Sequence, residues 1–135
     1  MKIEHTSAPH NEDINFLTQK INQEVSDKGM AYPFAFFIRD SEGEIIAGCN
    51  GSVIFGVIYT DQLWVNPDYR KQGLGQQLMK QVHDYGREIG CKMATCATMS
   101  FQGAQKFYEA LGYQVDFERS GYIDDSTCIF LRKIL

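Results

Sequence analysis

Long apolar runs and clustered basic residues are both missing from this chain of 135 residues. No stretch approaches the roughly 20 apolar residues that a membrane-spanning helix requires, so we expect no membrane segment. The N-terminal stretch MKIEHTSAPHNED also lacks the apolar core of a signal peptide. The formal net charge is −4 and the basic residues form no long run, which argues against a nucleic-acid-binding protein. We therefore expect a cytoplasmic protein with no membrane or nucleic-acid partner.

Paired cysteines are missing as well. The four cysteines form no C-x-x-C pair and stand among apolar neighbours, at Cys49, Cys91, Cys96 and Cys128. This pattern is typical of reduced structural thiols, so we expect neither a disulfide nor a metal site. With 44% apolar and 22% charged residues, the composition fits a single compact domain over residues 1–135.

Apolar periodicity divides the first half of the chain into one helix and three strands. Residues 11–29 keep helical spacing, with Asn11 as the candidate cap and Gly29 as the expected end. The polar turn SEGE separates strand-like stretches at 34–40 and 44–56, and another follows at 57–65. The front of the domain is thus predicted to be a helix followed by an antiparallel meander.

The second half predicts a crossover unit. Residues 74–89 are amphipathic, and Gly90 stands where a left-handed C-terminal cap is expected. The short apolar run 91–99 follows, so strand, glycine loop, helix and strand form a βαβ unit. A short helix at 103–112 and strands at 113–118 and 126–134 complete the chain. The predicted fold class is α/β, with a mixed, mostly antiparallel central sheet, one parallel crossover and flanking helices.

Two glycines, Gly73 and Gly75, stand at the start of the second predicted helix, directly after Arg70 and Lys71. Free amides at a helix N-terminus bind phosphate, and glycine lets the backbone turn unusually and approach a ligand closely. A plain tight turn into a helix is the alternative. The dinucleotide motif G-x-G-x-x-G is excluded because Leu78 occupies its third glycine position, and G-x-x-x-x-G-K-[ST] does not occur.

The stretch VNPDYRKQGLGQQLM, residues 65–79, resembles the signature of the GCN5-related N-acetyltransferase (GNAT) superfamily. The acetyl-coenzyme A loop of that family reads [R/Q]-x-x-G-x-[G/A], and Arg70, Gly73 and Gly75 fill its defining positions. A second stretch, AQKFYEALGY, resembles the family's A-x-x-F-Y-x-x-x-G-[FY] helix. The two motifs occur in the family's order and cover roughly residues 57 to 115, whereas the N-terminal part matches only by pattern. The resemblance implies the GNAT fold.

The resemblance also implies that acetyl-coenzyme A is the cosubstrate, and we expect no metal. The 57–65 strand is expected to splay from the 91–99 strand, which would open a wedge for the pantetheine arm, while the loop amides would hold the pyrophosphate. Where many members place an asparagine after the fifth strand, this chain has TMSFQGA. The expected cofactor-binding residues are Leu63, Trp64, Val65, Arg70, Lys71, Gln72, Gly73, Leu74, Gly75, Gln76, Ser100 and Gln102.

Three residues carry the catalytic roles that the resemblance implies. The amide of Leu63 would donate to the thioester carbonyl, where a preorganised N–H stabilises the oxyanion formed by direct attack of an amine. Tyr108 would protonate the departing thiolate, because a phenol with a pKa of about 10 can protonate a thiolate whose conjugate acid has a pKa of about 8.5. Its neighbour Phe107 is assigned to the core. Asp61 is the candidate base, since strand alternation would place it on the face of Leu63; a solvent-exposed carboxylate is the alternative.

Other polar and aromatic residues receive weaker assignments. The less favoured candidates for the base are Glu44, Asp124 and Asp125. The histidines predicted to lie on the surface are His5, His10 and His83. The acceptor pocket is expected to form from the first helix, GMAYPF and SGYIDDST, whose aromatic and acidic side chains would suit a cationic amine. These side chains are Tyr32, Phe34, Tyr122, Asp124 and Asp125.

The expected function is transfer of the acetyl group of acetyl-coenzyme A directly to a primary amine of a small molecule or peptide. The alternative is a non-catalytic coenzyme A-binding sensor or regulatory module of the same fold. The resemblance is to small bacterial members, which suggests a bacterial source. Dimers are frequent in this family, often through the C-terminal strands, so a homodimer is an open option, although no residue of the sequence demonstrates one.

Overall fold

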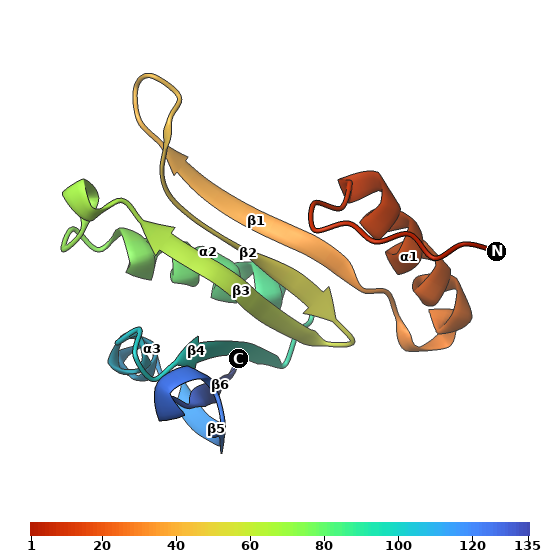
Figure 1. Cartoon of the computed structure of the whole chain (residues 1–135). Coiled ribbons are helices and arrows are strands. Elements are labelled where there is room, and N and C mark those ends of the chain that lie inside the picture. Colours follow the sequence, from red (N-terminus) through yellow and green to blue (C-terminus); the bar gives the residue numbers. More distant parts are fainter.

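The computed structural model describes all 135 residues, and Figure 1 shows the arrangement of their helices and strands. The elements in chain order are α1 (Asn11–Glu24), β1 (Tyr32–Arg39), β2 (Ile45–Ile54), β3 (Val57–Val65), α2 (Leu74–Glu88), β4 (Met93–Met99), α3 (Gln105–Ala110), β5 (Gln114–Arg119) and β6 (Cys128–Ile134). None of the helices is long and apolar enough to cross a membrane.

A single six-stranded sheet with the order β1-β2-β3-β4-β6-β5 organises the chain. Short turns connect β1, β2 and β3, and neighbouring strands joined in this way pair antiparallel. Only β3 and β4 pair in parallel, because α2 carries the chain back across the sheet between them. The predicted mixed sheet with one parallel crossover is therefore confirmed.

The sheet opens between its two halves. Parallel pairing between β3 and β4 runs only from Val57 opposite Met93 to Thr60 opposite Cys96. Beyond that point β3 continues to Val65 and β4 to Met99 without pairing to each other. The expected splay is present, and its inner edges carry backbone groups that the sheet does not use.

The core lies between the sheet and the helices α2 and α3. Leu78, Met79 and Val82 of α2 are almost completely buried, and they pack with Ile58 of β3 and Leu131 of β6. Burial of each such side chain contributes about 1.5–3 kcal/mol. All four cysteines are free and buried within or beside this core.

Element boundaries differ from the sequence prediction mainly at α1. The helix ends at Glu24 rather than at Gly29, and His10, not Asn11, occupies the cap position without a side-chain cap bond. The side-chain amide of Asn22 donates to the Ala31 carbonyl and accepts from the Ala31 N–H, both at 2.8 Å. This clamp turns the chain directly into β1, which no local helix pattern reveals.

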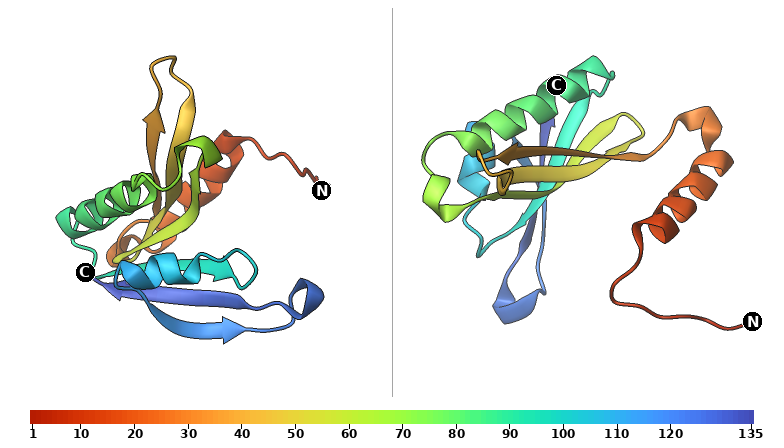
Figure 2. Two further views of the ribbon diagram at one scale, coloured as in Figure 1. Left: turned by 90° about the vertical axis from the view of Figure 1, so that its left-hand side faces the viewer. Right: turned by 90° about the horizontal axis from the view of Figure 1, so that it is seen from above.

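Helix α1 stands apart from the rest of the fold. Figure 1 and the right-hand view of Figure 2 place it beyond the start of β1, whereas α2 lies behind β1, β2 and β3. No helix lies in front of these three strands in Figure 1. The face of β1, β2 and β3 that lies opposite α2 is thus left open, and we call it the open face.

Candidate active site

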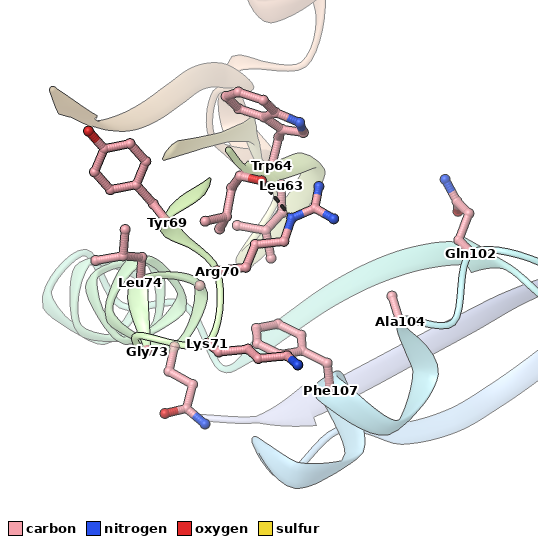
Figure 3. A pocket seen from close by; sticks show the side chains of 13 residues that line it. Leu63, Trp64, Tyr69, Arg70, Lys71, Gly73, Leu74, Gln102, Ala104 and Phe107 are labelled. Atoms are coloured by element: carbon pink, nitrogen blue, oxygen red, sulfur yellow. Dashed lines mark hydrogen bonds between the residues drawn. The ribbon is translucent and has the colours of Figure 1, made fainter. Parts of the chain in front are cut away.

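The splay contains a cavity with a volume of about 730 Å³. It lies between the free edge of β3, the loop before α2 and the start of α3, and Figure 3 shows the side chains that line it. The lining residues are Leu63, Trp64, Val65, Tyr69, Arg70, Lys71, Gly73, Leu74, Gly75, Gln76, Gln102, Ala104 and Phe107. No carboxylate side chain lines the cavity, whereas the cationic side chains of Arg70 and Lys71 do.

The N-terminus of α2 is prepared for an anion. Gly73 occupies the cap position with φ of +80°, a left-handed conformation that glycine adopts without strain, and no side chain caps the helix. The amides of Leu74, Gly75 and Gln76 therefore have no partner within the helix, and the first turn carries no acidic residue. Free amides and the positive end of the helix dipole favour a phosphate here.

Gly75 has a packing role beside its expected ligand role. A Cβ atom at this position would meet the Cε1 and Cζ atoms of Phe107 at 3.3 Å. The missing side chain lets α3 approach the first turn of α2, and it places the Phe107 ring at the cavity wall. Phe107 packs against the core as expected, and its half-buried ring also lines the cavity.

Backbone groups of β3 face the cavity. The Asn66 N–H donates to the Ile46 carbonyl, so the antiparallel ladder turns the amides and carbonyls of Leu63 and Val65 away from β2. They point to the side where β4 has already diverged. The Val65 carbonyl accepts a hydrogen bond of 2.8 Å from Arg70 Nε, which is drawn in Figure 3. This bond holds Arg70 at the cavity. The Leu63 amide also faces the cavity.

Asp61 lies where β3 leaves β4, directly after the last paired residue Thr60. A β-bulge makes it the extra residue, because Gln62 pairs with Asn50 while Thr60 pairs with Gly51. The bulge breaks the regular alternation on which the same-face argument depended, so that argument is wrong for this strand. The exposed carboxylate instead accepts from the Tyr59 hydroxyl at 3.5 Å and is not part of the cavity wall.

Tyr108 lies behind the cavity wall, with only 6% of its surface exposed. Its ring packs edge-on against Phe107 and Tyr113 at centroid distances of 5.2 and 5.4 Å. Its hydroxyl makes no hydrogen bond within the chain. Burial raises the pKa of Tyr108 above its ordinary value, so the phenol stays protonated at neutral pH. An acid must be protonated, and this phenol meets that condition, although Tyr108 itself does not line the cavity.

The residues after β4 differ in their availability. Gln102 Oε1 accepts from the Thr98 hydroxyl at 3.0 Å and from the Met99 amide at 2.8 Å, which leaves its side-chain NH₂ free to donate at the cavity. The Ser100 hydroxyl accepts from the Thr127 amide and does not line the cavity. Gln72 also lies outside the lining.

His83 is not a surface residue, and its predicted exposure was wrong. The ring is 6% exposed and shares a 2.8 Å hydrogen bond with the Tyr113 hydroxyl. Burial, followed by the nearby cations Lys133 and Arg87, lowers the pKa of His83 to about 4. The helical pattern placed it on a flank of α2, but the Tyr113 hydroxyl after α3 covers that flank.

The structure does not bring the aromatic residues expected at the acceptor pocket together at the cavity. Phe34 is buried in the core against Tyr85 of α2, so its acceptor role is wrong. Tyr32 lies on the same face, and burial raises its pKa, with Tyr85 as a further cause. Tyr122 and the Asp124–Asp125 turn are outside the cavity lining. The chain gathers no group of three or more His, Cys, Asp or Glu side chains placed to hold a metal.

Tyr69, Ala104 and Phe107 line the cavity although they were not among the expected cofactor-binding residues. Each lies within or next to one of the two motifs. The motif residues therefore carried the signal, and only the close approach of α3 to α2 shows that they share one wall.

The family model described as Acetyltransferase (GNAT) family matches residues 4–113. The chain belongs to this family. Its fold agrees, because the crystal structure of an acetyltransferase from Bacillus cereus ATCC 14579 superposes with a TM-score of 0.76 at 23% identity, covering 98% of both chains. A Bacillus anthracis str. Ames acetyltransferase solved in complex with acetyl coenzyme A gives a TM-score of 0.69 at 19% identity, over 76% of this chain and 62% of that one.

A thialysine N-epsilon-acetyltransferase from Bos taurus is 33% identical over 66 residues, which are 48% of this chain. The match spans only 39% of that relative's own length. The family and the fold are thus established for this chain, while the acceptor that each relative uses belongs to that relative.

Proposed function

We propose that this protein transfers the acetyl group of acetyl-coenzyme A to a primary amine of a small molecule or peptide. The observation that carries the proposal is a single cavity joining the uncapped N-terminus of α2 to the unpaired edge of β3. An anion site and a strand edge in one cavity suit a ligand with a phosphate at one end and an amide-bearing arm at the other. Supporting evidence comes from the family membership and from the thialysine N-epsilon-acetyltransferase among the relatives.

In this proposal each part of the chain has a separate task. The loop amides, with Arg70 and Lys71, bind the pyrophosphate, and the backbone of β3 orients the pantetheine arm. The Leu63 amide donates to the carbonyl oxygen whose negative charge grows as the amine attacks, which stabilises it by a few kcal/mol. Tyr108 gives its proton to the departing sulfur.

An amine arrives mostly protonated and must lose a proton before it attacks. Asp61 is the proposed acceptor of this proton, directly or through water, because its exposed carboxylate lies at the point where β3 leaves β4 and the splay begins. The non-catalytic sensor is the second candidate, and the burial of Tyr108 behind the cavity wall is the observation that favours it.

The test is release of coenzyme A thiol from acetyl-coenzyme A across amines, polyamines, aminoglycosides and lysine peptides. Tyr108→Phe removes only a hydroxyl and is expected to lower turnover by about 100-fold. Tyr85→Phe, a tyrosine packed against Phe34 and away from the cavity, is the matched control and should retain the rate. Coenzyme A binding without turnover on any amine would establish the sensor, and absence of coenzyme A binding would overturn both candidates.

A further inference from the structure

Helix α1 carries an apolar stripe that nothing covers. Ile14, Leu17 and Ile21 follow each other at helical spacing, and each side chain is about half exposed, at 47%, 57% and 55%. Phe16 is exposed beside them with Lys20 over its ring. Monomeric soluble proteins rarely leave such a contiguous stripe in water.

The open face of the sheet carries a second uncovered apolar surface. The register pairs Phe37 with Gly48 and Gly48 with Trp64, so the three share one face, opposite α2. Phe37 and Trp64 are 54% and 49% exposed. A Cβ on Gly48 would meet the Phe37 ring at 2.7 Å, which shows that this ring lies flat on the strand. Together with Ile45 these residues line a shallow hollow of about 300 Å³.

The two surfaces do not meet within one chain. The two hydrogen bonds between the Asn22 side chain and the Ala31 backbone fix the end of α1 to the start of β1. Asn22 is the one buried residue of the helix, and swinging α1 onto its own open face would break both bonds and leave a buried amide unpaired. Figure 1 and the right-hand view of Figure 2 show the helix held beyond the sheet.

We propose that two copies of this chain form a symmetric dimer in which α1 of each copy lies across the open face of the other. Such an exchange is isologous, since helix meets sheet twice across one two-fold axis. If each exposed apolar side chain of the two surfaces loses about 100 Å², half the area of a fully buried aromatic, the dimer buries roughly 1,400 Å² in total. This value lies within the range of specific interfaces of about 1,200–2,000 Å².

The exchange bears on the cavity. Trp64 lines both the hollow on the open face and the 730 Å³ cavity in the splay. The helix of the second copy would therefore lie next to the mouth of the splay, where the acceptor must enter. This consequence rests on the proposed function, whereas the dimer itself does not.

Sedimentation equilibrium at micromolar concentration tests the dimer. The wild-type chain is expected to sediment as a dimer, and Leu17→Glu and Phe37→Glu are each expected to sediment as monomers with unchanged circular dichroism. Both positions are exposed within one chain, so neither charge disturbs its core. Ile134→Glu, at an exposed apolar residue of β6 outside both surfaces, is the matched control and should remain dimeric. A monomeric wild type, or a dimer indifferent to both charges, would overturn the proposal.

Cysteine cross-linking separates exchange between copies from closure within one. The native cysteines are buried, so new surface thiols react alone. Single variants Leu17→Cys and Phe37→Cys, mixed and oxidised, are expected to give a disulfide-linked pair of unlike chains. Leu17→Cys mixed with Ile134→Cys should give none. A double variant Leu17→Cys with Phe37→Cys that cross-links only within one chain would instead show that α1 closes on its own sheet. These readouts need no enzymatic activity, so they stand apart from any failure of the proposed acetyl transfer.

Discussion

The helices α1 and α2 share the same kind of sequence pattern but differ in what covers them. Both place apolar residues at helical spacing over three to four turns. In α2 that face is buried against the sheet, with Leu78 only 3% exposed, whereas Leu17 of α1 is 57% exposed. Periodicity thus predicts a helix and its apolar face, but not the surface that will cover this face.

The largest expected contrast is in stability. Leu78→Ala removes a side chain packed between α2 and the sheet, and such substitutions cost about 2–5 kcal/mol. Leu17→Ala should change the free energy of unfolding by less than about 0.5 kcal/mol in dilute, monomeric protein, because water already surrounds that side chain. Urea denaturation at nanomolar concentration measures both. A large loss for Leu17→Ala in the monomer would mean that α1 packs on its own chain.

The next effect concerns pH and belongs to α2 alone. Because the pKa of His83 in the folded chain is about 4, below its ordinary 6.5, the unfolded chain binds more protons between these values. The neutral ring's stabilisation is therefore fully present above about pH 6.5 and is lost as the pH falls through 4. We expect a loss of about 2 kcal/mol, since solvent screens part of the shift.

His83→Gln separates this effect from the titration of carboxylates, because it keeps a side chain that can hydrogen-bond the Tyr113 hydroxyl and cannot gain a proton. Its stability should depend less steeply on pH between 6.5 and 4 than that of the wild type, measured by urea denaturation at each pH. Parallel pH profiles for the two proteins would show that His83 is not the titrating group.

The smallest expected effect concerns the N-termini of α1 and α2. The first turn of α1 contains Glu12 and Asp13, whereas that of α2 has no acidic residue and opens on the cavity. Gln76→Glu introduces a carboxylate into the cavity and should weaken coenzyme A binding roughly tenfold, by 1–2 kcal/mol of repulsion. Gln77→Glu adds the same charge one residue later, outside the cavity lining, and should bind as the wild type does. Calorimetric titration compares them, and equal affinities would place the phosphates elsewhere.

Much of the site could be predicted because its signals are local. Consecutive residues contain the basic pair, the left-handed glycine Gly73 and a helix start that no side chain caps. Most of the expected cofactor-binding residues line one cavity. The same-face argument for Asp61 failed because a bulge depends on pairing with β2, which lies outside the local pattern. The place of Phe107 in the cavity wall could not be predicted for a related reason, since it depends on how closely α3 approaches Gly75.

The amino-acid sequence by itself determined the family, the order of the elements and the phosphate-binding character of the loop before α2, because these properties depend on short-range conformation and on residue chemistry. Only the tertiary structure decided the burial of His83 under Tyr113, the isolation of α1 behind the Asn22 clamp and the position of Tyr108 behind the cavity wall. Each of these depends on contacts between residues far apart in the chain. A contact of that kind changes exposure and pKa without leaving a mark in the local pattern.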